Sequence, residues 1–309
     1  EGLVMSQVCT CCNQAMEFMR RIDFPIEAQA YFQGLMKRLE ALPSLQTRLE
    51  QIVQRFFDHR ASTIASLVPE LDALAEAAEA NRFSIHMLFL LYGAEPLKAL
   101  YQQKNMPEDI YWNTCQDLRY KLLECRQVKG IWGTVTIRWF EGFYRMERFA
   151  LGRMQYGITT FPVDEFTKAG VTVRKGDICH DMHIPSSGPL TWEKRLDSYK
   201  RAYAFFQDEL HGKPLVITCH SWLLYPDNAQ IFPQGSNMLD FMKDFTILEH
   251  RDYEGFPEAC RVFGRDWTGP LNELPDETRL QRNIIRWLKQ GRPMGDGFGV
   301  ILFDGEKIL

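Results

Sequence analysis

The spacing of apolar residues divides the chain into a helical first part and a second part in which strands and helices alternate. Up to about residue 130, apolar side chains recur every three or four positions, which is the spacing of one helix face. Leu45, Leu49 and Ile52 illustrate the pattern. It predicts helices over residues 27–42, 45–57, 69–80, 84–92 and 95–103, and one that starts at Pro107.

The pattern changes after Gly130-Ile-Trp-Gly133. A helix over 134–146 is followed by short segments with the character of β-strands. We expect strands over 149–158, 171–174, 177–184, 215–224, 245–250, 260–264 and 298–303, and helices over 191–210, 236–243 and 277–290. The chain is therefore predicted to be α+β, with a helical domain over residues 1–145 and a mixed-sheet α/β domain over residues 146–309.

Composition excludes several classes of partner. The net charge of -4 leaves no broad basic surface, so nucleic acid is not expected as a partner. No apolar run is long enough to cross a bilayer, so no membrane partner is expected, and residues 1–5 lack the features of a signal peptide. Most of the 8 cysteines are scattered, which is typical of reduced thiols in a cytoplasmic protein.

Two groups of potential metal ligands occur in the sequence. Cys9, Cys11 and Cys12 have no second paired cluster after them, and a frayed chain end is the simpler interpretation. His180 and His183 lie three residues apart, so a strand would place them on opposite faces. We therefore expect no metal site.

The turn Pro185-Ser-Ser-Gly-Pro-Leu190 joins the strand at 177–184 to the helix at 191–210. Free N–H groups at a helix start, together with the helix dipole, bind phosphate groups. The same residues are explained equally well by an ordinary turn, in which water and a serine hydroxyl accept hydrogen bonds from these N–H groups. Either Gly188 or Thr191 could be the N-cap residue of the helix. The candidate cofactor-binding residues are Ser186, Ser187, Gly188, Leu190 and Thr191.

Several segments carry a resemblance to a known family. They are Asp117-Leu118 with Gly130–Gly133, Phe149–Tyr156, His183–Leu190 and Cys219–Leu224. The element order of the second half resembles the Gcn5-related N-acetyltransferase (GNAT) fold. Across nearly its whole length, the chain is similar to a bacterial family that joins a helical N-terminal acyltransferase domain (NAT_N-like) to a GNAT-like C-terminal domain.

The resemblance implies an enzyme that uses acetyl-CoA or another acyl-CoA as co-substrate. In the GNAT fold, the turn after the fourth strand holds the pyrophosphate of coenzyme A, and the fourth and fifth strands separate to admit the thioester. The usual Q/R-x-x-G-x-G/A motif is missing from the turn at 185–190. Its letters occur instead at residues 292–297, before a strand rather than a helix.

Direct acyl transfer from coenzyme A to an amine of a small-molecule acceptor requires a general base and no covalent enzyme intermediate. His183 and His220 are the candidate bases, and Tyr225 could protonate the leaving thiolate. Arg153 and Gln155 are candidates for contacting the acceptor. Each of these residues also has a purely structural interpretation, as a packed or hydrogen-bonded side chain.

Two other functions remain open on the sequence alone. The missing motif allows a non-catalytic GNAT-like module that binds a metabolite or a partner protein. A thioesterase is least supported, because no G-x-S-x-G elbow and no nucleophile–base pair occur. The helical domain could shape the acceptor pocket, cover the cofactor or form a homodimer.

Overall fold

The structure is a computed structural model that describes residues 9–309. The residues considered for a signal peptide, 1–5, lie outside the described residues. The chain forms two compact units, one ending at Glu147 and the other beginning at Arg148. Within the described residues, no helix has both the length and the apolar content that crossing a bilayer requires.

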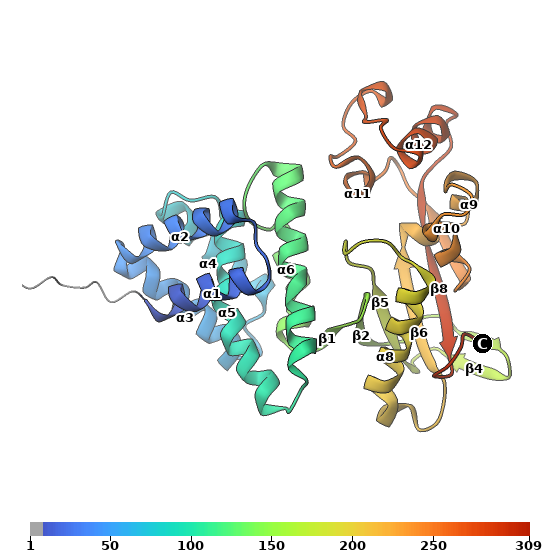
Figure 1. Ribbon diagram of the computed structural model, residues 1–309, viewed down its shortest axis with the longest axis horizontal. Helices are drawn as coiled ribbons and strands as arrows, with labels where there is room; N and C mark the ends of the chain where they lie inside the picture. The colour runs from blue at the N-terminus through green and yellow to red at the C-terminus, as the bar shows by residue number, and fades with distance from the viewer. Residues whose placement is uncertain (1–8) are drawn as a thin grey trace, which may run out of the picture. The chain divides into compact units, whose positions relative to one another are not determined.

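The first unit is helical, as predicted. Its central helix is α5, in which every residue from Ser84 to Ala94 is buried. A helix that is apolar on all sides belongs in the middle of a bundle, and the other helices surround it (Figure 1). The elements are α1 (Thr10–Arg21), α2 (Ile26–Glu40), α3 (Pro43–Asp58), α4 (Ile64–Ala77), α5 (Arg82–Gln103), α6 (Glu108–Lys129), η1 (Ile137–Phe140) and α7 (Glu141–Tyr144).

Several helix boundaries differ from the prediction. The two helices expected over 84–92 and 95–103 are one, because α5 continues through Pro96. α3 begins at Pro43, two residues before the predicted start at Leu45, and Leu42 is its N-cap residue. The cysteines that were assigned to a frayed end lie at the start of α1, with Cys9 as its N-cap residue. In α5, burial of the helix in the bundle outweighs the local preference of proline to end a helix.

The second unit is built on a six-stranded mixed sheet in the order β1-β2-β5-β6-β8-β7. Its strands are β1 (Arg148–Leu151), β2 (Met154–Thr160), β5 (Ile178–His183), β6 (Leu215–Ser221), β7 (Thr246–Asp252) and β8 (Gly295–Phe303). β5 and β6 are parallel, whereas the other neighbours are antiparallel. The helical part followed by a mixed sheet confirms the predicted fold class.

The remaining elements of this unit are a separate hairpin and a series of helices. They are β3 (Glu165–Lys168), β4 (Val171–Arg174), α8 (Trp192–Leu210), η2 (Trp222–Leu224), α9 (Asn228–Ile231), α10 (Asn237–Met242), α11 (Ala259–Phe263), η3 (Leu271–Glu273) and α12 (Arg279–Lys289). Figure 1 shows α9, α10 and α12 near the end of the sheet where β6 finishes and β8 begins.

Two predicted strands are wrong in detail. Residues 149–158 form a hairpin rather than one strand, because Gly152 adopts a positive φ of 71° and the chain reverses between β1 and β2. Residues 260–264 were expected to be a strand, but most of them belong to the short helix α11. A five-residue apolar segment cannot distinguish strand from helix by periodicity alone.

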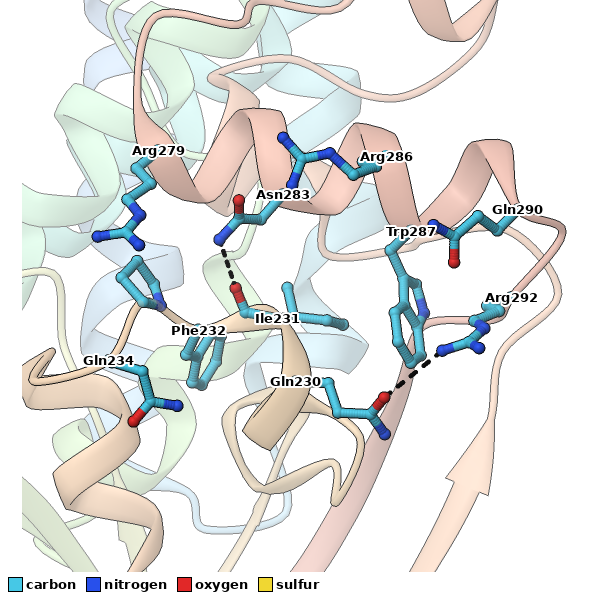
Figure 2. A pocket seen from close by; sticks show the side chains of 11 residues that line it. Gln230, Ile231, Phe232, Gln234, Arg279, Asn283, Arg286, Trp287, Gln290 and Arg292 are labelled. Carbon is cyan, nitrogen blue, oxygen red and sulfur yellow. Dashed lines mark hydrogen bonds between the residues drawn. The ribbon is translucent and has the colours of Figure 1, made fainter.

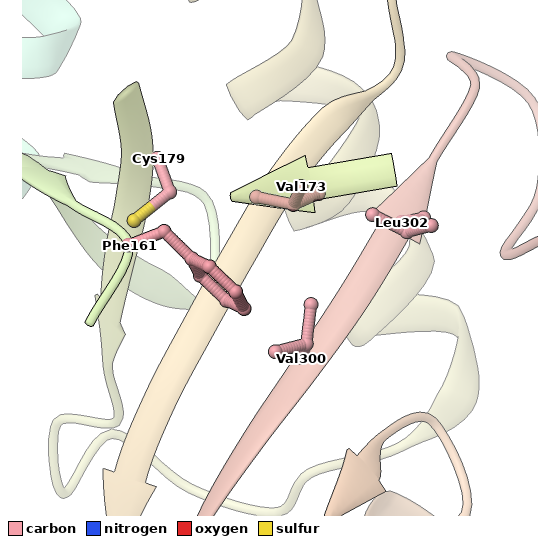
Figure 3. Close-up of a cluster of buried hydrophobic side chains, with 5 residues drawn as sticks. All are labelled: Phe161, Val173, Cys179, Val300 and Leu302. Carbon is pink, nitrogen blue, oxygen red and sulfur yellow. The ribbon is translucent and has the colours of Figure 1, made fainter. Parts of the chain in front are cut away.

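Opposite faces of the sheet are covered differently. Cys179 and its neighbour His180 point to opposite faces, as successive residues of a strand must. The Cys179 side packs in a cluster with Phe161, Val173, Val300 and Leu302 (Figure 3). On the other side, the His180 ring packs against Phe206 of α8, with 3.9 Å between ring centroids and an angle of 37° between the ring planes.

The start of α8 is fixed by a buried arginine. Arg195 has a side chain that is 1% exposed. Its Nε donates to Asp244 Oδ2 at 2.7 Å and its Nη2 to Asp240 Oδ2 at 2.7 Å, while Nη1 donates to the Leu190 carbonyl at 2.7 Å. This one side chain therefore joins α8 to α10, to the residues just after α10, and to the turn that precedes α8.

Arg195→Ala should lower the free energy of unfolding by about 3–5 kcal/mol, because Asp244 would stay buried without its cation. The matched control is Arg201→Ala on the same helix, where an exposed pair with Asp197 is lost. That control should cost less than about 1 kcal/mol. Urea unfolding of both variants measures the difference, and equal losses would contradict the assigned role of Arg195.

His180 should make stability depend on pH. Burial lowers the pKa of His180 to about 4, and neither ring nitrogen has a hydrogen-bond partner among the described residues. An unfolded histidine takes up a proton near pH 6.5, so the unfolded state binds more protons between these values. The contribution of the neutral His180 to the free energy of unfolding should be fully present above pH 6.5. That free energy should fall by up to about 3 kcal/mol as the pH approaches 4.

Urea unfolding between pH 7 and 4.5 tests this expectation. His180→Gln should be less sensitive to acid than the unsubstituted protein, whereas His211→Gln, at the exposed end of α8, should behave like the unsubstituted protein. The same acid sensitivity in His180→Gln and the unsubstituted protein would rule out His180 as its source.

Candidate functional site

A cavity opens where the two parallel strands at the centre of the sheet separate. β5 and β6 pair only at His180 with Ile217 and at Asp181 with Thr218. Beyond these pairs the strands diverge, and residues that follow on both strands line a cavity of about 340 Å³. Residues 182–184 form one wall and residues 219–223 form the other.

The predicted turn leads directly from this cavity to α8. Ser186 lines the cavity and is exposed. Gly188 adopts a φ of 108°, and no atom lies within 4 Å of a Cβ built there. Thr191, rather than Gly188, caps the helix, because its side chain accepts a hydrogen bond from the Lys194 amide at 3.3 Å. The turn is therefore open to solvent on the side of Gly188.

Arg153 contacts this turn rather than projecting from a strand. It lies in the reversal between β1 and β2, whereas Gln155 lies within β2. Its Nη1 donates to the Pro185 carbonyl at 2.8 Å and its Nη2 to the Gly188 carbonyl at 2.6 Å. With Arg195 on the Leu190 carbonyl, two arginines hold the backbone of the turn.

His220 forms a pair with a carboxylate that the sequence analysis did not identify. Its Nε2 lies 3.0 Å from Oδ1 of Asp296 on β8, and its side chain is 59% exposed. His220 is therefore not the buried histidine of the structural interpretation. The imidazole stands in the cavity with one nitrogen held and the Nδ1 side directed away from that bond.

Asp296 is held in the ionised form. Its side chain is 6% exposed, and Arg251 Nη2 donates to its Oδ2 at 2.6 Å. Burial alone would raise its pKa, but hydrogen bonds from His220, Arg251 and Tyr253 lower that pKa below its usual value. An ionised Asp296 accepts the Nε2–H of His220 and thereby fixes the ring orientation and the tautomer.

The two glycines on either side of Asp296 are a sequence signal for this residue. Its flanking glycines, Gly295 and Gly297, were taken as part of a turn before the last strand. They belong to β8 itself, and a Cβ at Gly297 would lie 2.1 Å from the Leu224 carbonyl oxygen. A charged residue between glycines inside an otherwise apolar strand indicates a site where the backbone is approached closely.

His183 and Gln155 occupy paired positions on neighbouring strands. His183 ends β5, lines the cavity and lies opposite Gln155 of β2. Gln155 is only 1% exposed, and it is not among the residues that line the cavity. The structure therefore brings His183 and His220 to one cavity, whereas Gln155 is buried and does not line it.

Tyr225 is the predicted residue that the structure separates most clearly from this cavity. Its side chain is 3% exposed and does not line the cavity. The hydroxyl donates to Asp252, and burial together with that carboxylate raises the pKa of Tyr225. Its role as the acid that protonates the leaving thiolate stays a prediction.

Two thiol environments bear on the expected chemistry. Cys219 lines the cavity, but burial raises the pKa of its thiol to about 12, so it is not a thiolate at neutral pH.

At the start of α1, the Cys9 thiol donates to Glu50 at 3.2 Å, and the Cys9 amide donates to Glu40 at 3.1 Å. These bonds fasten α1 to α2 and α3, and the expected lack of a metal site stays a prediction.

Comparisons with known proteins bear on the fold. Three solved acyltransferase structures share the fold: one in complex with decanoyl-CoA (22% identity, TM-score 0.73), one with decanoyl-CoA and teicoplanin (21%, 0.70) and one with CoA and 10C-teicoplanin (22%, 0.70). Each alignment covers 94% of this chain, and 88%, 88% and 87% of the three chains, respectively. A search of curated proteins found no match.

Family profiles identify both parts of the chain. The profile described as the N-acyltransferase N-terminal domain matches residues 13–146, and the profile described as the GNAT-like C-terminal domain matches residues 149–301. Together they cover almost all of the described residues and confirm the resemblance drawn from the sequence. The chain therefore belongs to the two-domain family that joins an N-acyltransferase N-terminal domain to a GNAT-like C-terminal domain.

Proposed function

We propose that this protein is an acyl-CoA-dependent N-acyltransferase that moves an acyl group from coenzyme A to an amine of a small-molecule acceptor. The observation that carries the proposal is the cavity between β5 and β6, with the His220–Asp296 pair in its wall. The cavity has room for an extended ligand and contains an imidazole whose orientation is fixed. Membership of the family indicates acyl transfer as the class of reaction.

The proposed cofactor position follows from the turn. Its carbonyl groups at Pro185, Gly188 and Leu190 accept hydrogen bonds from arginines, and the first turn of α8 follows within a few residues. A pyrophosphate would bind near Gly188, where the backbone is open, with the positive end of the α8 dipole nearby. The thioester would then extend into the cavity beside His183 and His220.

In the proposed reaction, the neutral acceptor amine attacks the thioester carbonyl carbon. A C–N bond forms, the C–S bond breaks, and coenzyme A leaves as a thiolate. His220 takes the amine proton on Nδ1, since its Nε2–H is held by Asp296. The proton then passes to the thiolate or to water. No enzyme nucleophile takes part, in agreement with the protonated state of Cys219.

His183 is the second candidate for the base, because it lines the same cavity. Asp296 favours His220 over it as the general base, since a bound carboxylate orients the ring and stabilises its charged form after proton transfer. We assign His183 to the wall that contacts the bound thioester.

Binding tests the cofactor part of the proposal. Calorimetric titration should show binding of acetyl-, octanoyl- or decanoyl-CoA; the two longer donors are chosen because solved structures of this fold contain decanoyl-CoA and octanoyl-CoA. No binding at millimolar ligand would overturn the proposal. Binding without acyl transfer to any of a panel of amines would favour a non-catalytic module, and thiol release without an acceptor would favour a thioesterase.

His220→Ala should lower kcat by about 10²–10⁴-fold with little change in the KM for acyl-CoA, because it removes a proton acceptor and no cofactor contact. Asp296→Asn should also lower kcat, since an amide no longer enforces the required tautomer. Steady-state kinetics with an amine acceptor measures both effects. The controls are His250→Ala and Asp252→Asn, which change the same residue types outside the cavity; losses as large in the controls would count against His220.

Gly188→Leu should weaken coenzyme A binding by about tenfold or more, because a side chain would occupy the space of the phosphates and remove charge-assisted hydrogen bonds. The control is Gly212→Leu at the other end of α8, where φ is 77° and the surroundings are equally open. Both variants should lose about 1–2 kcal/mol of stability through the unfavourable φ. Equal coenzyme A affinity in the two variants would place the pyrophosphate elsewhere.

A further inference from the structure

A second cavity, of about 380 Å³, lies between α12 and the segment that follows α9. Figure 2 shows Arg279, Arg286 and Arg292 around it, with Trp287 forming part of its wall. Asn283 donates to the Ile231 carbonyl at 2.8 Å and thus ties the two walls together. None of these residues belongs to the cavity between β5 and β6.

The charge of this cavity is uncompensated. Three arginines line it, and none of its lining residues is acidic. Arg292 stacks on the Trp287 ring at 4.7 Å and reaches only the neutral Gln230, at 3.5 Å. Arg279 and Arg286 form no ion pair within residues 9–309. In a chain of net charge -4, where Arg195 and Arg251 are paired with aspartates, this grouping is unusual.

We propose that this cavity binds a phosphate monoester. A planar guanidinium matches the oxygen geometry of phosphate and can donate two parallel hydrogen bonds. Arg279, Asn283 and Arg286 lie on one face of α12 at helix spacing and line the same cavity. Because the Asn283 amide donates to the Ile231 carbonyl, the two guanidinium groups are the charged donors on this wall. Amide groups from Gln230, Gln234 and Gln290 add neutral donors around the cavity.

The cavity lies at the same end of the sheet as the proposed pyrophosphate turn. β5 and β6 are parallel, so the turn after β5 and the segment after β6 leave the sheet in the same direction. The wall at residues 230–234 leads directly into α10, and Arg195 joins Asp240 of α10 to the turn carbonyl at Leu190. One linked piece of structure therefore supports both places.

Two sources could supply the phosphate monoester. Coenzyme A carries a 3′-phosphate on its ribose besides the pyrophosphate, so one bound molecule could occupy both places; this source rests on the proposed function. The other source is a separate phosphorylated small molecule, which needs no bound coenzyme A. Both present the same chemistry to the three arginines.

The test uses the double variant Arg279→Gln/Arg286→Gln and the control Lys289→Gln. Lys289 carries the same charge on the same helix but does not line the cavity. Calorimetry compares coenzyme A with 3′-dephospho-coenzyme A. If the source is the 3′-phosphate, the double variant should bind coenzyme A about tenfold or more weakly. It should then bind 3′-dephospho-coenzyme A as the unsubstituted protein does, and Lys289→Gln should change neither affinity by more than about twofold.

Phosphoserine and inorganic phosphate, titrated in the absence of coenzyme A, test the second source. Binding that the double variant loses and Lys289→Gln retains would support a site for a separate phosphorylated molecule. If the double variant alters neither the preference for the 3′-phosphate nor the binding of phosphoserine or phosphate, the proposal is overturned. Failure of coenzyme A to bind at all would instead refute the proposed function, and the phosphate titration would still report on this cavity.

Discussion

A single buried guanidinium supports much of the second unit. Arg195 satisfies two carboxylates and one carbonyl while almost completely removed from water. A buried charge is costly unless it is paired and fully hydrogen-bonded, so its partners have to stay in place around it. Because those partners belong to α10, to Asp244 and to the turn before α8, their relative positions are determined together.

This arrangement also sets the polarity of the turn. Arg153 and Arg195 occupy the carbonyl groups of Pro185, Gly188 and Leu190. Three carbonyl groups of the turn are thereby used within the protein, and the Ser187 amide donates to one of them, the Pro185 carbonyl, at 2.8 Å. The arginines thus reduce the number of acceptors that the turn presents to an anionic ligand. The same turn without these arginines would present more acceptors and would favour anions less.

The strands, turn and helix of the candidate site could be predicted from the sequence more completely than the contacts between its side chains. The strand ending at His183, the turn and the helix after it were predicted because their apolar spacing and their Gly and Pro signals are local. His220 was also identified as a candidate. Asp296 was not, since its relation to His220 depends on pairing between β6 and β8, some 75 residues apart in sequence. Arg153 was given a contact with the acceptor because the reversal at Gly152 was not recognised.

The short pairing between β5 and β6 has a consequence for self-association. Beyond His180 and Asp181, each of these strands keeps its other neighbour, β2 or β8, but loses its partner on the inner side. The ladder between β5 and β6 therefore stops inside the sheet, and the two strand edges beyond it line opposite sides of the cavity rather than facing outward. Exposed edges recruit strands from other molecules. Here the two edges lie within the sheet, each beside its outer neighbour, so the protein can keep an opening between two strands without adding an edge at the rim of the sheet.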